Sequence, residues 1–130
     1  MEEVYEAREF FTGVYTTGEL GNGTKEQPLI VTTSKGLVTI IGCTHPGVVN
    51  IIQTAKDIVP NERVYLVMGG FHLSGASSAQ IRSIIDSFDQ LGVERIAPCY
   101  CSGDETRRLF KEHYGVDYVE SGVGKRIPLP

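Results

Sequence analysis

Cysteines and histidines are the side chains of this sequence whose types and spacing could support metal chemistry. Thiolate sulphur and neutral imidazole nitrogen are ligands that zinc and iron prefer in proteins. They gather in three short stretches, GCTHPG, GGFHL and APCYCSG, which carry Cys43 and His45, His72, and Cys99, Tyr100 and Cys101. These residues can form a site only if the fold brings the three stretches together.

Each of these residues also has an ordinary structural interpretation. His45 can cap the helix that follows it, and His72 comes after two glycines that allow close backbone approach. Cys43 follows two isoleucines and can be a small buried apolar residue. The C-x-C stretch lacks the C-x-x-C spacing that is typical of redox and zinc motifs. The metal hypothesis therefore depends on the position that the residues share.

The elements around the three stretches predict that shared position. Three strands each lead through one stretch into a helix with a periodic apolar face. The predicted pairs are Leu37–Ile41 with Pro46–Val59, Val64–Met68 with Ser78–Leu91, and Arg95–Pro98 with a helix that ends near Tyr114. Such alternation is typical of α/β layers, in which ligands bind beyond the carboxyl ends of the strands. All three stretches are expected on that rim.

Capping residues and glycines predict where the helices start and end. Pro46 suits a first helical position, with His45 or Thr44 near the cap, and Ser102 or Asp104 is expected to cap the third helix. Glycines 92 and 115 are expected to end the second and third helices.

The two ends of the chain complete the predicted elements. Leu29–Thr33 and Leu37–Ile41 are expected to form an antiparallel pair, because Ser34-Lys35-Gly36 has the residues of a hairpin turn. A last strand is predicted at Asp117–Glu120.

Composition bounds the class of protein. The 130 residues form one domain, 1–130, and a net charge of -4 argues against a nucleic-acid or anionic-membrane partner. The longest apolar runs fall short of the ~20 residues that span a bilayer. The acidic N-terminus and three cysteines, expected to be reduced, predict a cytoplasmic protein.

G-x-S-x-G, G-x-G-x-x-G and P-loop motifs are absent from the sequence, which removes the usual signals of a serine hydrolase, a dinucleotide enzyme and an NTPase.

The order of several segments resembles one branch of the metallo-β-lactamase superfamily. These are GVYTTGE, EQPLIV, KGLVTIIGCTHPGVVNII, VYLVMGGFHL and RIAPCYCSGDETRRLF with YGVDYVESGVGK. The branch comprises metal-dependent hydrolases similar to dihydropterin-aminobenzene phosphate synthase. The resemblance implies an α/β fold, half of an αββα sandwich, with a mixed sheet and helices packed on one face.

Two departures from the family limit what this resemblance implies. The H-x-H-x-D-H metal motif of the superfamily's first half is missing, so the chain resembles the C-terminal half alone. The branch has a metal-binding histidine where this chain has Tyr100, and a phenol with a pKa of ~10 is a poor zinc ligand at neutral pH. The resemblance thus implies a metal set of Cys43, His45 and His72, with Tyr100 as a degenerate position.

We expect from this resemblance a hydrolase half that binds zinc or iron weakly or not at all and is inactive alone. If a missing N-terminal half-domain completed it, bound metal would activate water against a small-molecule substrate. The alternative is a non-catalytic binding or regulatory half-domain that self-associates. Strands such as VYLVMGG are apolar on both faces, so the exposed face of half a sandwich predicts a homodimer.

Replacement of Tyr100 by histidine is expected to raise the affinity for zinc by adding a third imidazole beside His45 and His72. An extended C-x-C stretch would direct position 100 away from both cysteines.

Overall fold

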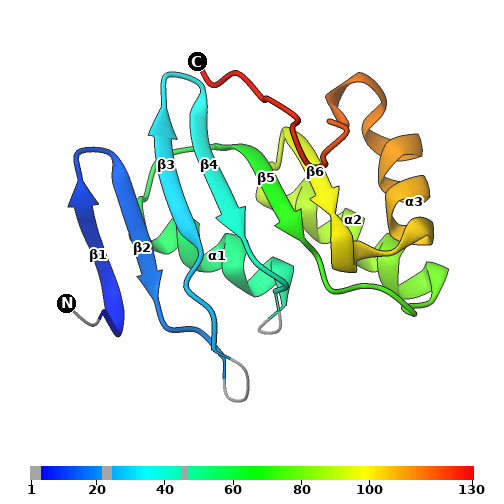
Figure 1. Cartoon of the computed structure of the whole chain (residues 1–130), viewed down its shortest axis with the longest axis horizontal. Helices are drawn as coiled ribbons and strands as arrows, with labels where there is room; N and C mark the ends of the chain where they lie inside the picture. Colours follow the sequence, from blue (N-terminus) through cyan, green and yellow to red (C-terminus); the bar gives the residue numbers. More distant parts are fainter. Residues whose placement is uncertain (1–3, 22–24, 45–46) are drawn as a thin grey trace.

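A single mixed sheet organises the molecule. The computed structural model describes residues 4–21, 25–44 and 47–130, including the backbone but not the side chain of Tyr100. Within this part of the chain six strands lie side by side in the order of the sequence (Figure 1). They are β1 (Glu6–Phe11), β2 (Val14–Gly18), β3 (Leu29–Thr33), β4 (Gly36–Ile41), β5 (Val64–Gly70) and β6 (Arg95–Cys99). The pairings from β1 to β4 are antiparallel, and β4, β5 and β6 run parallel.

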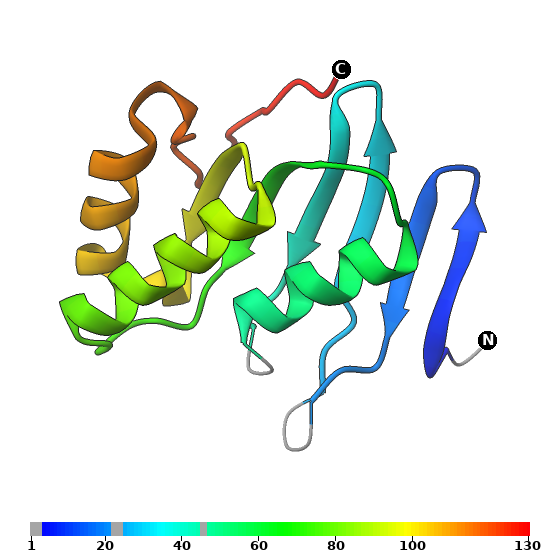
Figure 2. The ribbon, with the colours of Figure 1, turned by 180° about the vertical axis from the view of Figure 1, so that it is seen from behind.

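The helices follow the parallel strands and lie on one side of the sheet (Figure 2): the first two connect β4 to β5 and β5 to β6, and the third follows β6. They are α1 (Val48–Ile58), α2 (Ser78–Leu91) and α3 (Asp104–Tyr114), and two short 3-10 turns are η1 (Tyr100–Ser102) and η2 (Gly115–Asp117). This arrangement confirms the expected α/β fold with a mixed sheet and helices on one face. Among the described residues, no helix has the length and apolar character needed to cross a bilayer.

The main core lies between the helices and the parallel strands. Three phenylalanines occupy its centre, Phe71 after β5, Phe88 of α2 and Phe110 of α3, and each is at most 1% exposed. Their ring centroids lie 5.4 to 5.8 Å apart in edge-to-face orientations, which aromatic pairs favour. This packing holds α2 and α3 against the end of β5 and so positions the loops there.

The opposite side of the sheet is only partly covered. Val119 and Ile127 of the C-terminal segment pack over Val38, Leu66 and neighbouring residues. Farther toward β1, apolar side chains remain in contact with solvent, and we refer to this area as the open sheet face. It comprises Phe10, Leu29 and Ile40, which are 40%, 36% and 37% exposed.

Several predicted boundaries are confirmed. The antiparallel pair is present as β3 and β4, and α2 spans the predicted Ser78–Leu91. Ser77 and Gln80 form a capping box at the start of α2, and Gly92 ends the helix in the left-handed conformation.

Other boundary predictions are wrong. α1 begins at Val48 after Gly47, and α3 begins after Gly103, so glycine backbones with positive φ replace the predicted side-chain caps. Pro46 and His45 lie outside the described residues. The expected strand at residues 117–120 is the end of η2 followed by one isolated bridge between Ile96 and Tyr118, in which the N–H of Val119 donates to the Ile96 carbonyl. The pair β1–β2 adds two strands, Glu6–Phe11 and Val14–Gly18, for which the sequence analysis gave no bounds.

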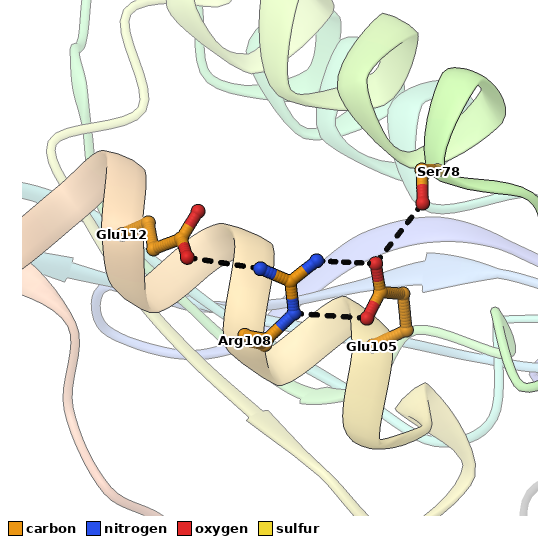
Figure 3. A network of polar contacts seen from close by, with 4 residues as sticks. All are labelled: Ser78, Glu105, Arg108 and Glu112. Carbon is orange, nitrogen blue, oxygen red and sulfur yellow. Dashed lines mark hydrogen bonds and ion pairs between the residues drawn. The ribbon is translucent and has the colours of Figure 1, made fainter.

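A surface network joins the exposed sides of α2 and α3 (Figure 3). Arg108 donates two hydrogen bonds to the carboxylate of Glu105, at 2.6 and 3.0 Å, and a third to Glu112 at 2.9 Å. Ser78 at the start of α2 donates to the same Glu105 carboxylate at 3.0 Å. The bonds to Arg108, with a further contribution from Ser78, lower the pKa of Glu105. The network thus links the first turns of the two helices.

Candidate metal centre

The carboxyl ends of β4, β5 and β6 bring two thiols and one imidazole together. Cys43 follows β4, His72 follows β5, and Cys101 lies in η1 after β6. The Cys43 sulphur is 3.1 Å from Nδ1 of His72 and 2.7 Å from the Cys101 sulphur. All three potential ligand atoms lie within 4.8 Å of one another. The parallel strands therefore form the rim that the sequence predicts, and three of the six candidate residues converge there.

A carboxylate from outside the rim fixes the loop that carries Cys43. Oε1 of Glu26 accepts hydrogen bonds from the backbone N–H groups of Cys43, at 2.7 Å, and Thr44, at 3.1 Å. Glu26 itself is held by a backbone bridge to Leu20 between β2 and β3. The backbone at Thr44 has a φ of 61°, a conformation that is costly for a residue with a branched side chain. The two bonds to Glu26 offset that cost and hold the Cys43 loop in place.

The loop after β5 carries His72 in an equally unusual conformation. Gly70 donates its backbone N–H to the carbonyl of Gly42, which extends the β4–β5 pairing to the edge of the site. A Cβ atom at Gly69 would lie 2.1 Å from the Ile41 carbonyl oxygen, so only glycine allows the strands to approach this closely. His72 then has a φ of 51° and is exposed. Left-handed backbone at a residue other than glycine is a feature that concentrates at functional sites.

The loop after β6 is anchored by a buried serine. Ser102 Oγ donates to the Cys99 carbonyl at 2.7 Å and accepts the N–H of Phe71 at 3.0 Å. Cys101 contributes its carbonyl to the N–H of Ser74 at 3.3 Å, which ties the loop after β6 to the loop after β5. The turn η1 also shows that the C-x-C stretch is not extended, contrary to expectation. The Ser102 side chain therefore links the end of β6 to the backbone of Phe71, and it does not cap α3.

The predicted site residues have different outcomes. Cys43 and His72 are brought together. His45 and the side chain of Tyr100 lie outside the part of the chain that the structure describes. Cys101 joins the cluster, although the family resemblance directs attention to Tyr100 beside it. Sequence analysis had no signal for Glu26, because a carboxylate that accepts backbone N–H groups from a distant loop belongs to no motif. Metal binding by these residues remains a prediction.

The donor set fits a transition metal ion. Two sulphurs and one imidazole nitrogen are soft and borderline ligands of the kind that bind zinc, and three protein ligands are typical of zinc sites with an open position. Sulphurs on one tetrahedral zinc lie about 3.8 Å apart when each Zn–S bond is about 2.3 Å. The observed separation of 2.7 Å is shorter. A rotation of the two half-buried cysteine side chains that moved the sulphurs about 1 Å farther apart would give the separation of two zinc ligands.

Comparisons with known proteins show which proteins this chain resembles. No protein-family model matches it. It is 36% identical over 108 residues to 7,8-dihydropterin-6-methyl-4-(beta-D-ribofuranosyl)-aminobenzene-5'-phosphate synthase of Methanocaldococcus jannaschii, covering 83% of this chain and 37% of that protein. An uncharacterized protein of the same organism is 33% identical over 96 residues, covering 74% of this chain and 35% of that protein.

A solved structure extends the match to almost the whole chain. The crystal structure of a metal-dependent hydrolase of the beta-lactamase superfamily has a TM-score of 0.84 and 30% identity, covering 98% of this chain and 57% of that one. The chain therefore spans little more than a third of the curated relatives and just over half of the solved hydrolase. These matches confirm the resemblance to the metal-dependent hydrolases of the metallo-β-lactamase superfamily and to the synthase branch, and the fold corresponds to half of theirs.

Proposed function

We propose that this chain is a metal-binding part of a metal-dependent hydrolase of the metallo-β-lactamase type, and that alone it binds metal weakly and is catalytically inactive. The observation that carries the proposal is the convergence of Cys43, His72 and Cys101 at the ends of three parallel strands. A relative described as a metal-dependent hydrolase, similar in fold over 98% of this chain, supports it.

Weak binding and inactivity follow from what the described rim offers. A metal ion in a hydrolase acts as a Lewis acid and activates a water molecule. The reaction also needs a pocket that orients the substrate beside the metal. The cluster lies at the carboxyl ends of the parallel strands, and His72 is exposed to solvent. A second polypeptide that supplied further ligands and walls would allow such a centre to act on a small-molecule substrate.

Metal titration tests the proposed site. Cobalt(II) added to the reduced chain should produce the absorption band of thiolate-bound cobalt, and zinc should displace it. Cys43→Ser, Cys101→Ser and His72→Ala should each weaken binding by about tenfold or more, the scale on which lost metal-site residues act.

Cys99→Ser is the matched control, because Cys99 lies two residues from Cys101 and is not one of the three clustered residues. It should bind cobalt as the wild type does. Equal binding by the Cys101→Ser and wild-type chains would contradict the site, and metal-dependent phosphoester hydrolysis by the chain alone would contradict the proposed inactivity.

A second candidate function is self-association without catalysis, which the open sheet face favours. Phe10, Leu29 and Ile40 expose apolar side chains on this face, and soluble proteins use such patches mainly as contact surfaces. A second copy of the chain, related by two-fold symmetry, is the simplest cover. The two functions are compatible, since the metal cluster lies beyond the carboxyl ends of β4, β5 and β6, whereas the open sheet face is formed by side chains within β1, β3 and β4.

A further inference from the structure

We propose that Cys43 and Cys101 form a reversible disulfide, which would remove both thiols from the metal centre. The inference goes beyond metal binding, although its regulatory consequence rests on the proposed function. The observation that carries it is the 2.7 Å separation of the two sulphurs. This is about 1 Å less than two ligands of one zinc ion would show and about 0.7 Å more than a disulfide bond.

The two sulphurs are held near each other by contacts on both loops. Glu26 fixes the backbone of Cys43, and Ser74 contacts the carbonyl of Cys101. The Cys101 thiol also lies 3.6 Å from the Cys43 carbonyl oxygen, so it is directed toward the loop of Cys43. Bond formation therefore requires a small side-chain rotation instead of a rearrangement of the fold. Both thiols are half-buried, which leaves them accessible to a small oxidant.

The chemistry needs an external disulfide such as oxidised glutathione. One cysteine sulphur attacks the glutathione disulfide, forms a mixed disulfide and releases one glutathione thiol. The second cysteine sulphur attacks the mixed disulfide, forms the Cys43–Cys101 bond and releases the second glutathione. The protein loses two electrons and two protons, and one glutathione disulfide becomes two thiols. A thiol reductant reverses both steps.

The bond and the metal ion exclude each other. A sulphur in a disulfide has no thiolate to donate, so the oxidised chain would retain only His72 of the three clustered ligands. Bound zinc would occupy both thiolates and slow their oxidation. The cluster would thus exist in two states, a reduced pair that binds metal and an oxidised pair that cannot.

Peptide mapping tests the bond directly. The full-length reduced chain, free of metal, is equilibrated with oxidised glutathione, alkylated and digested with trypsin without reduction. Cleavage after Lys35, Lys56, Arg95 and Arg107 places Cys43 in peptide 36–56 and both Cys99 and Cys101 in peptide 96–107. The two peptides should appear linked, and the linked species should disappear after reduction.

The variants identify the partner of Cys43. The link should persist in Cys99→Ser and be lost in Cys101→Ser and Cys101→Ala, each checked for folding by circular dichroism. A wild-type chain that keeps three alkylated thiols, or a link that survives in a Cys101 variant, would overturn the proposal.

Repeating the oxidation with zinc present distinguishes a failure of this inference from a failure of the proposed function. Zinc added before oxidised glutathione should slow formation of the link several-fold, and the oxidised chain should bind no cobalt until it is reduced. A link that forms equally fast with zinc present would contradict the metal centre and leave the disulfide standing. Zinc binding without any link would contradict the disulfide alone.

Discussion

Glu26 is the residue on which the geometry of Cys43 depends. Its carboxylate accepts two part-buried backbone N–H groups of the Cys43 loop, and a hydrogen bond of this kind contributes about 1–2 kcal/mol. We expect Glu26→Ala to lower the free energy of unfolding by about that amount and to weaken cobalt binding. Glu26→Gln, which keeps an acceptor oxygen, should lose less of both. Urea denaturation and cobalt titration measure the two effects, and an alanine variant as stable as the wild type would contradict the role of Glu26.

His72 has a backbone conformation that another residue would hold more easily. Its φ of 51° costs a residue with a Cβ atom about 1 kcal/mol, whereas glycine adopts it freely. We expect His72→Gly to be more stable than His72→Ala by about 1 kcal/mol in urea denaturation, while both lose metal affinity equally. Equal stability of the two variants would mean that the backbone at this position is not left-handed in solution.

The residues of the candidate centre were only partly predictable. Cys43, His72 and Cys101 share the ends of parallel strands, and strand–helix alternation places them on one rim. The contact between Cys43 and Cys101 depends on the turn η1, and no sequence motif predicts that turn. The family resemblance pointed to Tyr100 as the ligand position and not to Cys101 beside it. The anchoring by Ser102 was also missed, because the residue resembles a helix cap in sequence and instead bonds to Cys99 and Phe71.

At the scale of elements, the α2–α3 network gives a pH dependence. The bonds from Arg108 and Ser78 lower the pKa of Glu105 below its ordinary value in the folded chain, so its stabilising effect is complete above the pKa of the unfolded chain. The effect is lost as pH falls through the lowered pKa, because protonation removes the charge that Arg108 contacts. We expect the wild type to exceed Glu105→Gln in urea midpoint at neutral pH, with a gap that closes in acid.

Glu112→Gln is the control for this prediction. Glu112 accepts a single bond from Arg108 and none from α2, so its loss should change the midpoint less than the loss of Glu105. A gap between wild type and Glu105→Gln that stays constant from neutral to acidic pH would contradict the assignment.

Elements were predictable where the apolar pattern had a clear period. The helical stripe of α2 and its glycine stop predicted both ends of the helix, and the β-branched runs predicted β3 and β4. The strand β1 was missed because all its residues are exposed, so EAREFF shows no alternation of buried and exposed positions. The glycines before α1 and α3 were missed because caps are expected to be polar side chains.

At the scale of the whole molecule, the open sheet face predicts an assembly. We expect light scattering at micromolar concentration to give the mass of a dimer. Ile40→Lys places a charge on the open face and should shift the chain to a monomer. Val116→Lys is the matched control, since Val116 is 93% exposed in η2 at the other end of the sheet and should leave the dimer intact. A monomeric wild type would refute the assembly.

The order of the strands has a consequence for how the chain is made. Each strand of the sheet pairs with the strand that precedes it in the sequence, from β1 through β6. During synthesis every new strand therefore meets a neighbour that has already left the ribosome, and no finished ladder has to open for a later strand. The sheet can grow from one side as translation proceeds. Cys43 emerges long before Cys101, so the pairing of the two thiols must wait until translation has passed β6.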